Sequence, residues 1–142
     1  MSGACLVDTG VLSEARRGAR ANAGVRRFFE VARRTGQALY LSVITVGELR
    51  RGVELLRHRN DASQADRLES WLELLLADHR EGILDFGPEE AQVWGRLRVP
   101  RPENAFDKQI AATALTHGLT LVTGNVAHFE GLGVELLNPF GK

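Results

Sequence analysis

The sequence contains a single cysteine, Cys5, in 142 residues. One thiol cannot form an internal disulfide, and its isolation excludes every zinc site that is built from several cysteines. Cys5 falls within a short apolar run, residues 4–7, which predicts a buried strand. We therefore interpret Cys5 as a core thiol rather than a nucleophile.

Long hydrophobic runs are also absent. The first apolar run, residues 4–7, is only about one strand long and ends at Asp8, so it does not have the form of a signal peptide. The longest later run, residues 74–77, is far short of the roughly 20 residues that cross a membrane. We therefore expect a cytoplasmic protein that does not associate with membranes.

Lysine is scarce, because 16 of the 18 basic residues are arginine. The net charge is zero, but residues 1–60 carry eleven arginines and five acids, whereas residues 61–142 carry seven basic residues and thirteen acids. A basic half that is rich in arginine can bind the phosphates of a nucleic acid. The alternative is that these arginines form the solvated faces of helices, and the charge distribution alone favours this second interpretation.

Among the features that are present, residues 106–140 are the most informative. Asp107 stands at the start of a segment whose apolar residues recur three and four positions apart, which predicts a helix. A His-Gly pair at 117–118 is typical of the end of a helix, and residues 119–123 then predict a short strand. Open α/β folds place their chemistry where helix N-termini meet the carboxyl ends of strands. We therefore expect Asp107 to belong to a functional site.

The rest of the chain alternates strands with helices. Strands are predicted at 4–7, 39–42, 83–86, 119–123 and 134–137, and the other helices at 11–17, 22–34, 44–58, 65–79 and 88–98. Strands that are joined by crossover helices form a mainly parallel sheet with helices on both faces. The predicted fold class is therefore α/β, a three-layer sandwich in one domain over residues 1–142. A polar break at 60–63 predicts a helical hairpin at about residues 45–80.

Glu48 lies near the start of the predicted helix 44–58 and allows two interpretations. Thr45 is a candidate N-cap, and an acid three residues after it has the spacing of a capping box. Glu48 would then only cap the helix. In the alternative, its carboxylate belongs to a functional site, and this segment taken alone favours the two interpretations about equally.

Carboxylates from distant segments are expected at one edge of such a sheet. Asp8 ends the first strand, Glu48 lies in the first turns of the helix after the second strand, and Asp107 opens the helix before the fourth strand. Three carboxylates in one place repel one another unless a cation neutralises them. Because the ligands are oxygens and cysteine ligands are absent, Mg²⁺ or Mn²⁺ is favoured over zinc. Such a site can hold one or two ions that activate water for attack at phosphorus. Three further polar residues follow the end of the fourth strand: Thr123, Asn125 and His128.

Four segments resemble the PIN domain family, in particular its toxins of the VapC and FitB type: LVDTGVLSE, SVITVGELRRGVE, FDKQIAATAL and LVTGNVAHFEGLGVELLNPF. They occur in the family's order and together span essentially the whole chain. The resemblance implies a metal-dependent ribonuclease, usually a dimer, that is inhibited by a cognate DNA-binding antitoxin. By position, it implies metal-binding and catalytic roles for Asp8, Glu48 and Asp107. It also implies that four polar residues support the acids or the bound water: Thr9, Thr45, Thr123 and Asn125.

The sequence departs from the family pattern at three positions. Gly10 replaces the usual asparagine, and Gly124 replaces a frequent arginine. His128 stands where a fourth acid is expected. A neutral imidazole brings no negative charge and is a poor Mg²⁺ ligand, although it suits Mn²⁺ better, so a second ion should bind more weakly. His128 is either a ligand or a surface residue of a degraded site, and Glu130 is the residue that could compensate.

The sequence therefore predicts an endoribonuclease that depends on Mg²⁺ or Mn²⁺ and resembles the toxin of a type II toxin–antitoxin pair. The expected partners are an RNA substrate, a cognate antitoxin and a second copy of the chain, and Arg50 and Arg51 are candidate RNA contacts. The alternative is a catalytically weakened PIN module that binds RNA or an antitoxin without efficient cleavage. A phosphatase with Asp8 as nucleophile is disfavoured, because Gly10 occupies the position of its second acid.

Overall fold

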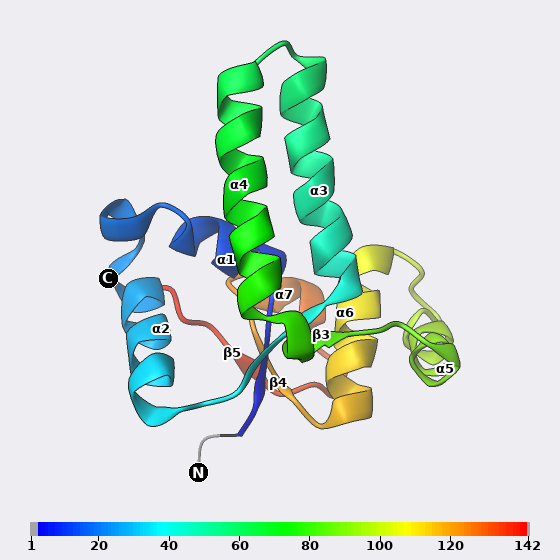
Figure 1. Cartoon of the computed structure of the whole chain (residues 1–142). Coiled ribbons are helices and arrows are strands. Elements are labelled where there is room, and N and C mark those ends of the chain that lie inside the picture. The colour runs from blue at the N-terminus through cyan, green and yellow to red at the C-terminus, as the bar shows by residue number, and fades with distance from the viewer. Residues whose placement is uncertain (1–2, 142) are drawn as a thin grey trace.

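The computed structural model describes residues 3–141 and shows a parallel sheet with helices on both sides (Figure 1). The strands are β1 (Cys5–Val7), β2 (Leu39–Ser42), β3 (Ile83–Leu84), β4 (Thr120–Val122) and β5 (Leu136–Leu137). Their order across the sheet is β3-β2-β1-β4-β5, and each neighbouring pair is parallel. The sheet that the alternation of elements predicts is therefore confirmed.

Helices cover both faces of this sheet. They are α1 (Thr9–Ala15), α2 (Ala23–Thr35), α3 (Val43–His58), α4 (Ala62–Asp78), α5 (Pro88–Leu97), α6 (Ala105–His117) and α7 (Val126–Phe129), with 3₁₀ turns η1 (Gly18–Arg20) and η2 (Arg80–Gly82). Side chains of β1 alternate between the faces: Cys5 and Val7 pack with α1 to α4, whereas Leu6 packs with α6 and α7. The predicted three-layer α/β sandwich is confirmed.

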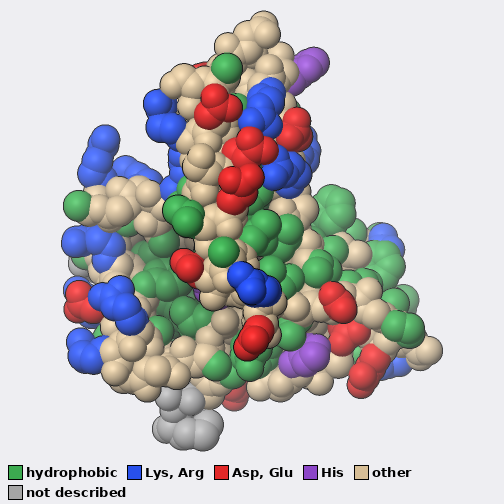
Figure 2. All heavy atoms as spheres, in the orientation of Figure 1, with side chains coloured by type: hydrophobic (Ala, Val, Ile, Leu, Met, Phe, Trp, Pro, Cys, Tyr) green, Lys and Arg blue, Asp and Glu red, His purple; other side chains and the backbone are tan. Residues whose placement is uncertain are grey.

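Helices α3 and α4 lie side by side and project beyond the sheet (Figure 1). Their inner faces place Leu49, Val53 and Leu72 in the core. Acidic and basic side chains gather on the projecting part (Figure 2). There Glu69 of α4 accepts hydrogen bonds from Arg50 and Arg57 of α3, the first at 2.7 Å. The hairpin is therefore cross-linked by exposed ion pairs in addition to the apolar residues between its two helices.

The start of α3 differs from the sequence-based prediction. Ser42 caps this helix, because its Oγ accepts a hydrogen bond from the backbone N–H of Ile44 at 3.0 Å. Strand β2 leads into α3 without a linker, so the first unpaired N–H groups of the helix lie beside Ser42. Thr45 is instead fully buried within α3. The predicted capping box at Thr45 and Glu48 is therefore wrong.

Two other differences concern short-range signals. Helix α4 begins at Ala62, three residues before its predicted start, because the Asp61 side chain caps it by accepting from the N–H of Gln64 at 3.2 Å. Helix α7 lies where only a short connection is predicted, since a single turn carries too little hydrophobic periodicity to be recognised. Within residues 3–141, no helix is both long enough and apolar enough to cross a membrane.

Candidate active site

Asp8, Glu48 and Asp107 line one open pocket of about 440 Å³. Asp8 directly follows β1, Glu48 is the sixth residue of α3, and Asp107 is the third residue of α6. Thr9, Thr123 and Asn125 line the same pocket. The acids that the sequence places at one edge of the sheet thus come together in the structure.

Both carboxylate oxygens of Asp8 are held by fixed donors. The backbone N–H of Thr9 donates to Oδ1 at 2.8 Å, and the hydroxyl of Thr123 donates to Oδ2 at 2.8 Å. Thr123 is fully buried, and its Oγ1 also accepts from the backbone N–H of Asn125 at 3.0 Å. Because Thr123 directly follows β4 and Asp8 directly follows the neighbouring β1, the sheet itself fixes the orientation of Asp8.

The pKa of Asp8 is raised above its ordinary value, chiefly because burial disfavours the charged form. The hydrogen bonds from Thr123 and Thr9 act in the opposite direction, and the negative charge of Asp107 raises the pKa further. The ionised Asp8 is therefore only partly stabilised by its hydrogen bonds and by the charge of His128, because burial outweighs them. A bound cation would offset both burial and the repulsion by Asp107.

Glu48 is connected to the same centre through Thr9. The hydroxyl of Thr9 donates to Oε1 of Glu48 at 2.6 Å and lies 3.0 Å from the hydroxyl of Thr45. Thr45 is buried beneath this contact. Two of the three threonines that the resemblance assigns to a supporting role, Thr9 and Thr45, thus lie beside Glu48.

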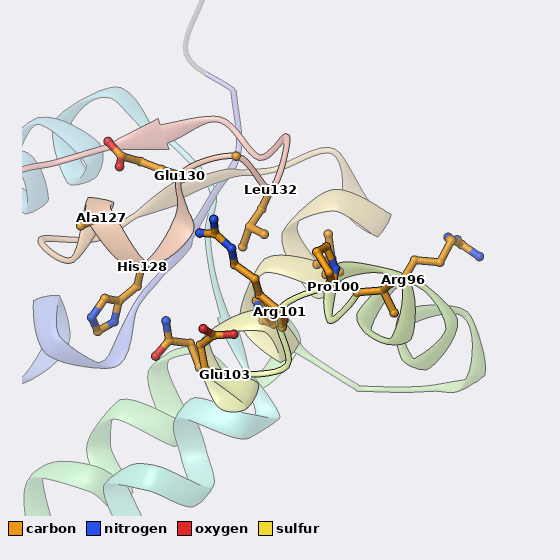
Figure 3. Close-up of a pocket in the computed structure, with 13 residues that line it drawn as sticks. Arg96, Pro100, Arg101, Glu103, Ala127, His128, Glu130 and Leu132 are labelled. Atoms are coloured by element: carbon orange, nitrogen blue, oxygen red, sulfur yellow. Dashed lines mark hydrogen bonds between the residues drawn. The ribbon is translucent and has the colours of Figure 1, made fainter.

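His128 binds Asp107 directly. Its Nδ1 lies 2.8 Å from Oδ2 of Asp107, and it extends from α7 at the edge of the acid pocket. Glu130 lies outside that pocket, and in Figure 3 its carboxylate is directed away from His128. The side chain that touches the acids is therefore His128 and not Glu130.

A second cavity, of about 460 Å³, lies on the far side of His128. Figure 3 shows the side chain of Arg101 extending into it between His128 and Leu132, while Arg96 points outward. Lys108 also lines it, but this buried ammonium is occupied by the backbone carbonyl of Arg101. His128 lines this cavity and also contacts Asp107 of the acid pocket.

The donors in the acid pocket suit a hard divalent cation in their chemistry. Within residues 3–141, however, no group of three or more His, Cys, Asp and Glu side chains is gathered closely enough to hold a metal ion. Glu48 and Asp107 are held in their present positions by Thr9 and His128. Mg²⁺ is usually bound by one or two carboxylates and keeps several waters. The residues therefore fit an ion held by few carboxylates better than one held in a cage of acids.

Three residues of the pocket were not predicted as site residues: Gly10, Gly124 and Phe140. A Cβ added at Gly124 would lie 2.7 Å from ring atoms of Phe140. The ring thus occupies the space that a side chain at position 124 would need, which accounts for glycine there. The signal in the sequence is the closing NPF segment, which returns the chain to the end of β4.

The two candidate RNA contacts on α3 lie in different surroundings. Arg50 pairs with Glu69 at 2.7 Å and Glu54 at 3.4 Å, within the hairpin. Arg51 is exposed and lines an opening next to Glu48. Only Arg51 therefore faces the neighbourhood of the acids.

The PIN domain matches residues 5–130 of this chain. The chain belongs to the PIN domain family. The matched range contains Asp8, Glu48, Asp107 and His128, so the three acids and the histidine of the candidate site lie inside this PIN domain. The resemblance read from the four sequence segments is confirmed.

Relatives with established names place the chain near the FitB and VapC proteins. Plasmid stability protein StbB of Pseudomonas syringae pv. tomato is 31% identical over 95% of this chain and 97% of its own length. Toxin FitB of Neisseria gonorrhoeae is 35% identical, covering 72% of this chain and 76% of FitB. Ribonuclease VapC1 of Rickettsia felis is 33% identical, covering 75% and 80%. The crystal structure of FitAcB from Neisseria gonorrhoeae has a chain that is 31% identical, with a TM-score of 0.81 over 95% of this chain and 97% of that chain.

Proposed function

We propose that this PIN domain is a divalent-metal-dependent endoribonuclease and the toxin of a toxin–antitoxin pair. The observation that carries the proposal is the pocket in which Asp8, Glu48 and Asp107 meet. The relative named ribonuclease VapC1 supports RNA as the substrate class, and the relative named toxin FitB supports the role of a toxin. Phosphodiester hydrolysis is a chemistry that a divalent cation held by one or two carboxylates can serve.

Asp8 and Asp107 would hold Mg²⁺ or Mn²⁺, with Glu48 as a further ligand or as the acceptor of a proton. When bound, the ion would polarise the phosphate and lower the pKa of a water molecule. Thr9 and Thr123 keep the oxygens of Asp8 in a fixed orientation, so little reorganisation is needed on binding. Oε1 of Glu48 accepts from Thr9, which leaves Oε2 to take a proton from an attacking water.

The proposal extends to two protein partners. A toxin requires a cognate antitoxin, and the resemblance to FitB and VapC proteins favours a DNA-binding antitoxin and a homodimer. A reading frame for a small DNA-binding protein beside the gene would identify the antitoxin. Co-purification of its product with this chain would test the pairing, and light scattering would give the number of copies of each.

Asp8→Asn is the substitution that tests the activity. It keeps the size of the side chain but removes the charge that would bind the ion, so we expect RNA cleavage to fall by at least about 100-fold. Cleavage of structured RNAs is measured with Mg²⁺ and with Mn²⁺. Asp85→Asn is the matched control, because Asp85 is exposed after β3 and outside the pocket, and it should cleave normally. Undiminished metal-dependent cleavage by Asp8→Asn would refute the proposal.

A PIN module with weakened catalysis is the second candidate, and the bond between His128 and Asp107 favours it. That bond engages Oδ2 of Asp107, which is one of the two carboxylate oxygens available to an ion. The two candidates differ in the behaviour of the unaltered protein. Cleavage that depends on Mg²⁺ or Mn²⁺ supports the enzyme, whereas RNA binding without detectable cleavage supports the weakened module.

A further inference from the structure

A mainly apolar pocket of about 530 Å³ adjoins the acid pocket on the other side of Glu48. Its lining consists of Val43, Ile44, Gly47, Glu48, Arg51 and Phe106. Glu48 lines both pockets, and Phe106 directly precedes Asp107 on α6. Whatever fills this pocket therefore lies next to the bond that the acids would cleave.

Phe106 exposes 65% of its surface, although it belongs to a well-formed helix. Its position as the second residue of α6 is tied to that of Asp107, so the ring stays at the edge of the site. Together with Val43 and Ile44 in the same pocket, the ring forms an exposed apolar patch, and such patches are typical of surfaces that contact another molecule. Stacking on such a ring is a common way for proteins to hold a base of single-stranded RNA.

Arg51 supplies a charge at the same place. Among residues 3–141 it makes no ion pair or side-chain hydrogen bond, whereas Arg50 and Arg57 on the same helix are both paired with Glu69. Its guanidinium therefore keeps its donors for a ligand, and guanidinium suits phosphate in particular. The exposed aromatic ring of Phe106 suits the base of a nucleotide, and the unpaired guanidinium of Arg51 suits its phosphate.

We propose that Phe106 and Arg51 form a seat for one nucleotide of the RNA, next to the phosphate that is cleaved. The base stacks on Phe106 against Val43 and Ile44, and Arg51 pairs with a backbone phosphate. This inference rests on the proposed function. RNA is favoured over a protein partner because an apolar protein surface placed here would bury Arg51 and Glu48 without partners.

Two substitutions at Phe106 separate stacking from general apolar contact. Binding of a single-stranded RNA of about ten nucleotides is measured by fluorescence anisotropy, with EDTA to prevent hydrolysis. Phe106→Leu keeps an apolar side chain but loses the ring, so we expect affinity to fall roughly tenfold. Phe106→Tyr keeps the ring and should bind within about twofold of the unaltered protein.

Gly47→Leu tests the pocket without touching Phe106. A Cβ at Gly47 would meet nothing within 4 Å, and replacing glycine inside α3 favours the helix, so this variant should fold. Its side chain would fill the pocket, and we expect RNA affinity to fall as far as in Phe106→Leu. Leu74→Ala is the matched control: Leu74 is 66% exposed on α4 and does not line the pocket, so binding should not change.

The outcomes distinguish the seat from the activity itself. If Phe106→Leu binds RNA as the unaltered protein does while Asp8→Asn still abolishes cleavage, the seat is refuted and the ribonuclease stands. If Phe106→Leu and Phe106→Tyr both weaken binding and both change the oligomeric state on a sizing column, the pocket is a contact between copies and the seat is also refuted. If the unaltered protein neither binds nor cleaves RNA, both proposals fail.

Discussion

The acid pocket and the α3–α4 hairpin use polar contacts under opposite conditions. In the pocket, Asp8 is 8% exposed, and its oxygens are bound by Thr9 and by the fully buried Thr123. On the hairpin, Glu69 is shared by Arg50 and Arg57, whose side chains are 36% to 40% exposed. Water can replace the hairpin contacts more readily than the buried bond between Thr123 and Asp8. A hydrogen bond should therefore contribute far more to the stability of the fold in the pocket than on the hairpin.

The two carboxylates also differ in the direction of their pKa shift. Burial raises the pKa of Asp8, whereas hydrogen bonds from Arg57 and Arg50 lower the pKa of Glu69 to about 2. The charged form is thus disfavoured in the pocket and favoured on the hairpin. A site that must attract a cation benefits from the first condition, because the cation relieves a cost that is already present. A projecting pair of helices benefits from the second.

Among the substitutions that test this contrast between pocket and hairpin, Thr123→Val is expected to have the largest effect on stability. The substitution keeps the shape of the side chain but leaves Oδ2 of Asp8 and the N–H of Asn125 without their partner. We expect the free energy of unfolding to fall by roughly 1–3 kcal/mol, because buried polar groups lose their hydrogen bonds. The pKa of Asp8 should rise further, since the bond from Thr123 lowers it, so the acidic limb of the cleavage profile should move to higher pH.

Urea unfolding and a pH profile of cleavage measure these two changes. Thr35→Val is the control on an exposed helix end: the Thr35 hydroxyl donates to the carbonyl of Val31 at 2.8 Å, but water can replace it. That variant should unfold within about 0.5 kcal/mol of the unaltered protein. If Thr123→Val and Thr35→Val lost the same free energy of unfolding, burial would not make the hydrogen bonds of the pocket more stabilising than exposed ones.

The architecture around Asp8 could be predicted from the sequence because it follows from the general topology of parallel α/β sheets. Parallel strands end at one edge of the sheet, so acids that follow β1 and precede β4 must approach each other. The contact between Thr9 and Glu48, 39 residues apart, could not be predicted, because it depends on how α3 is rotated about its axis. The sequence predicts this helix over residues 44–58 with Thr45 as a candidate N-cap, whereas Ser42 caps it in the structure.

The contact between His128 and Asp107 could not be predicted from the sequence either. The residue type shows that an acid is missing, and it shows nothing about which side chain the imidazole contacts. That contact depends on α7, a single turn that the hydrophobic pattern does not reveal. Phe140 was missed for a related reason, since it reaches the pocket only because the chain after β5 passes over Gly124.

An intermediate effect is expected from His128→Asp. The new carboxylate would lie against Asp107, so repulsion should lower the melting temperature in EDTA. Mn²⁺ should then raise the melting temperature more than in the unaltered protein, because the ion binds the folded state and neutralises the added charge. Thermal unfolding with EDTA and with Mn²⁺ gives both shifts.

The matching substitution on the hairpin is His58→Asp. His58 is exposed at the end of α3, outside the acid pocket, so the same change of residue should make melting no more sensitive to Mn²⁺. If His128→Asp responds to Mn²⁺ no more than the unaltered protein does, the acids do not share a cation at that position.

The smallest effect is expected from Glu69→Gln on the hairpin. The pKa of Glu69 falls from 4.5 to about 2 on folding, so its ion pairs contribute fully above about pH 4.5, and this contribution is lost as the pH falls toward about 2. The unaltered protein should therefore lose more stability than Glu69→Gln between about pH 7 and about pH 3. Because the pairs are exposed, the variant should be only slightly less stable at neutral pH, and about 1 M salt should narrow the difference. Urea unfolding at both pH values measures these differences in the free energy of unfolding.

If Glu69→Gln lost as much stability at neutral pH as Thr123→Val does, exposed and buried contacts would contribute alike. The contrast between hairpin and pocket would then have to rest on the apolar residues at the base of α3 and α4.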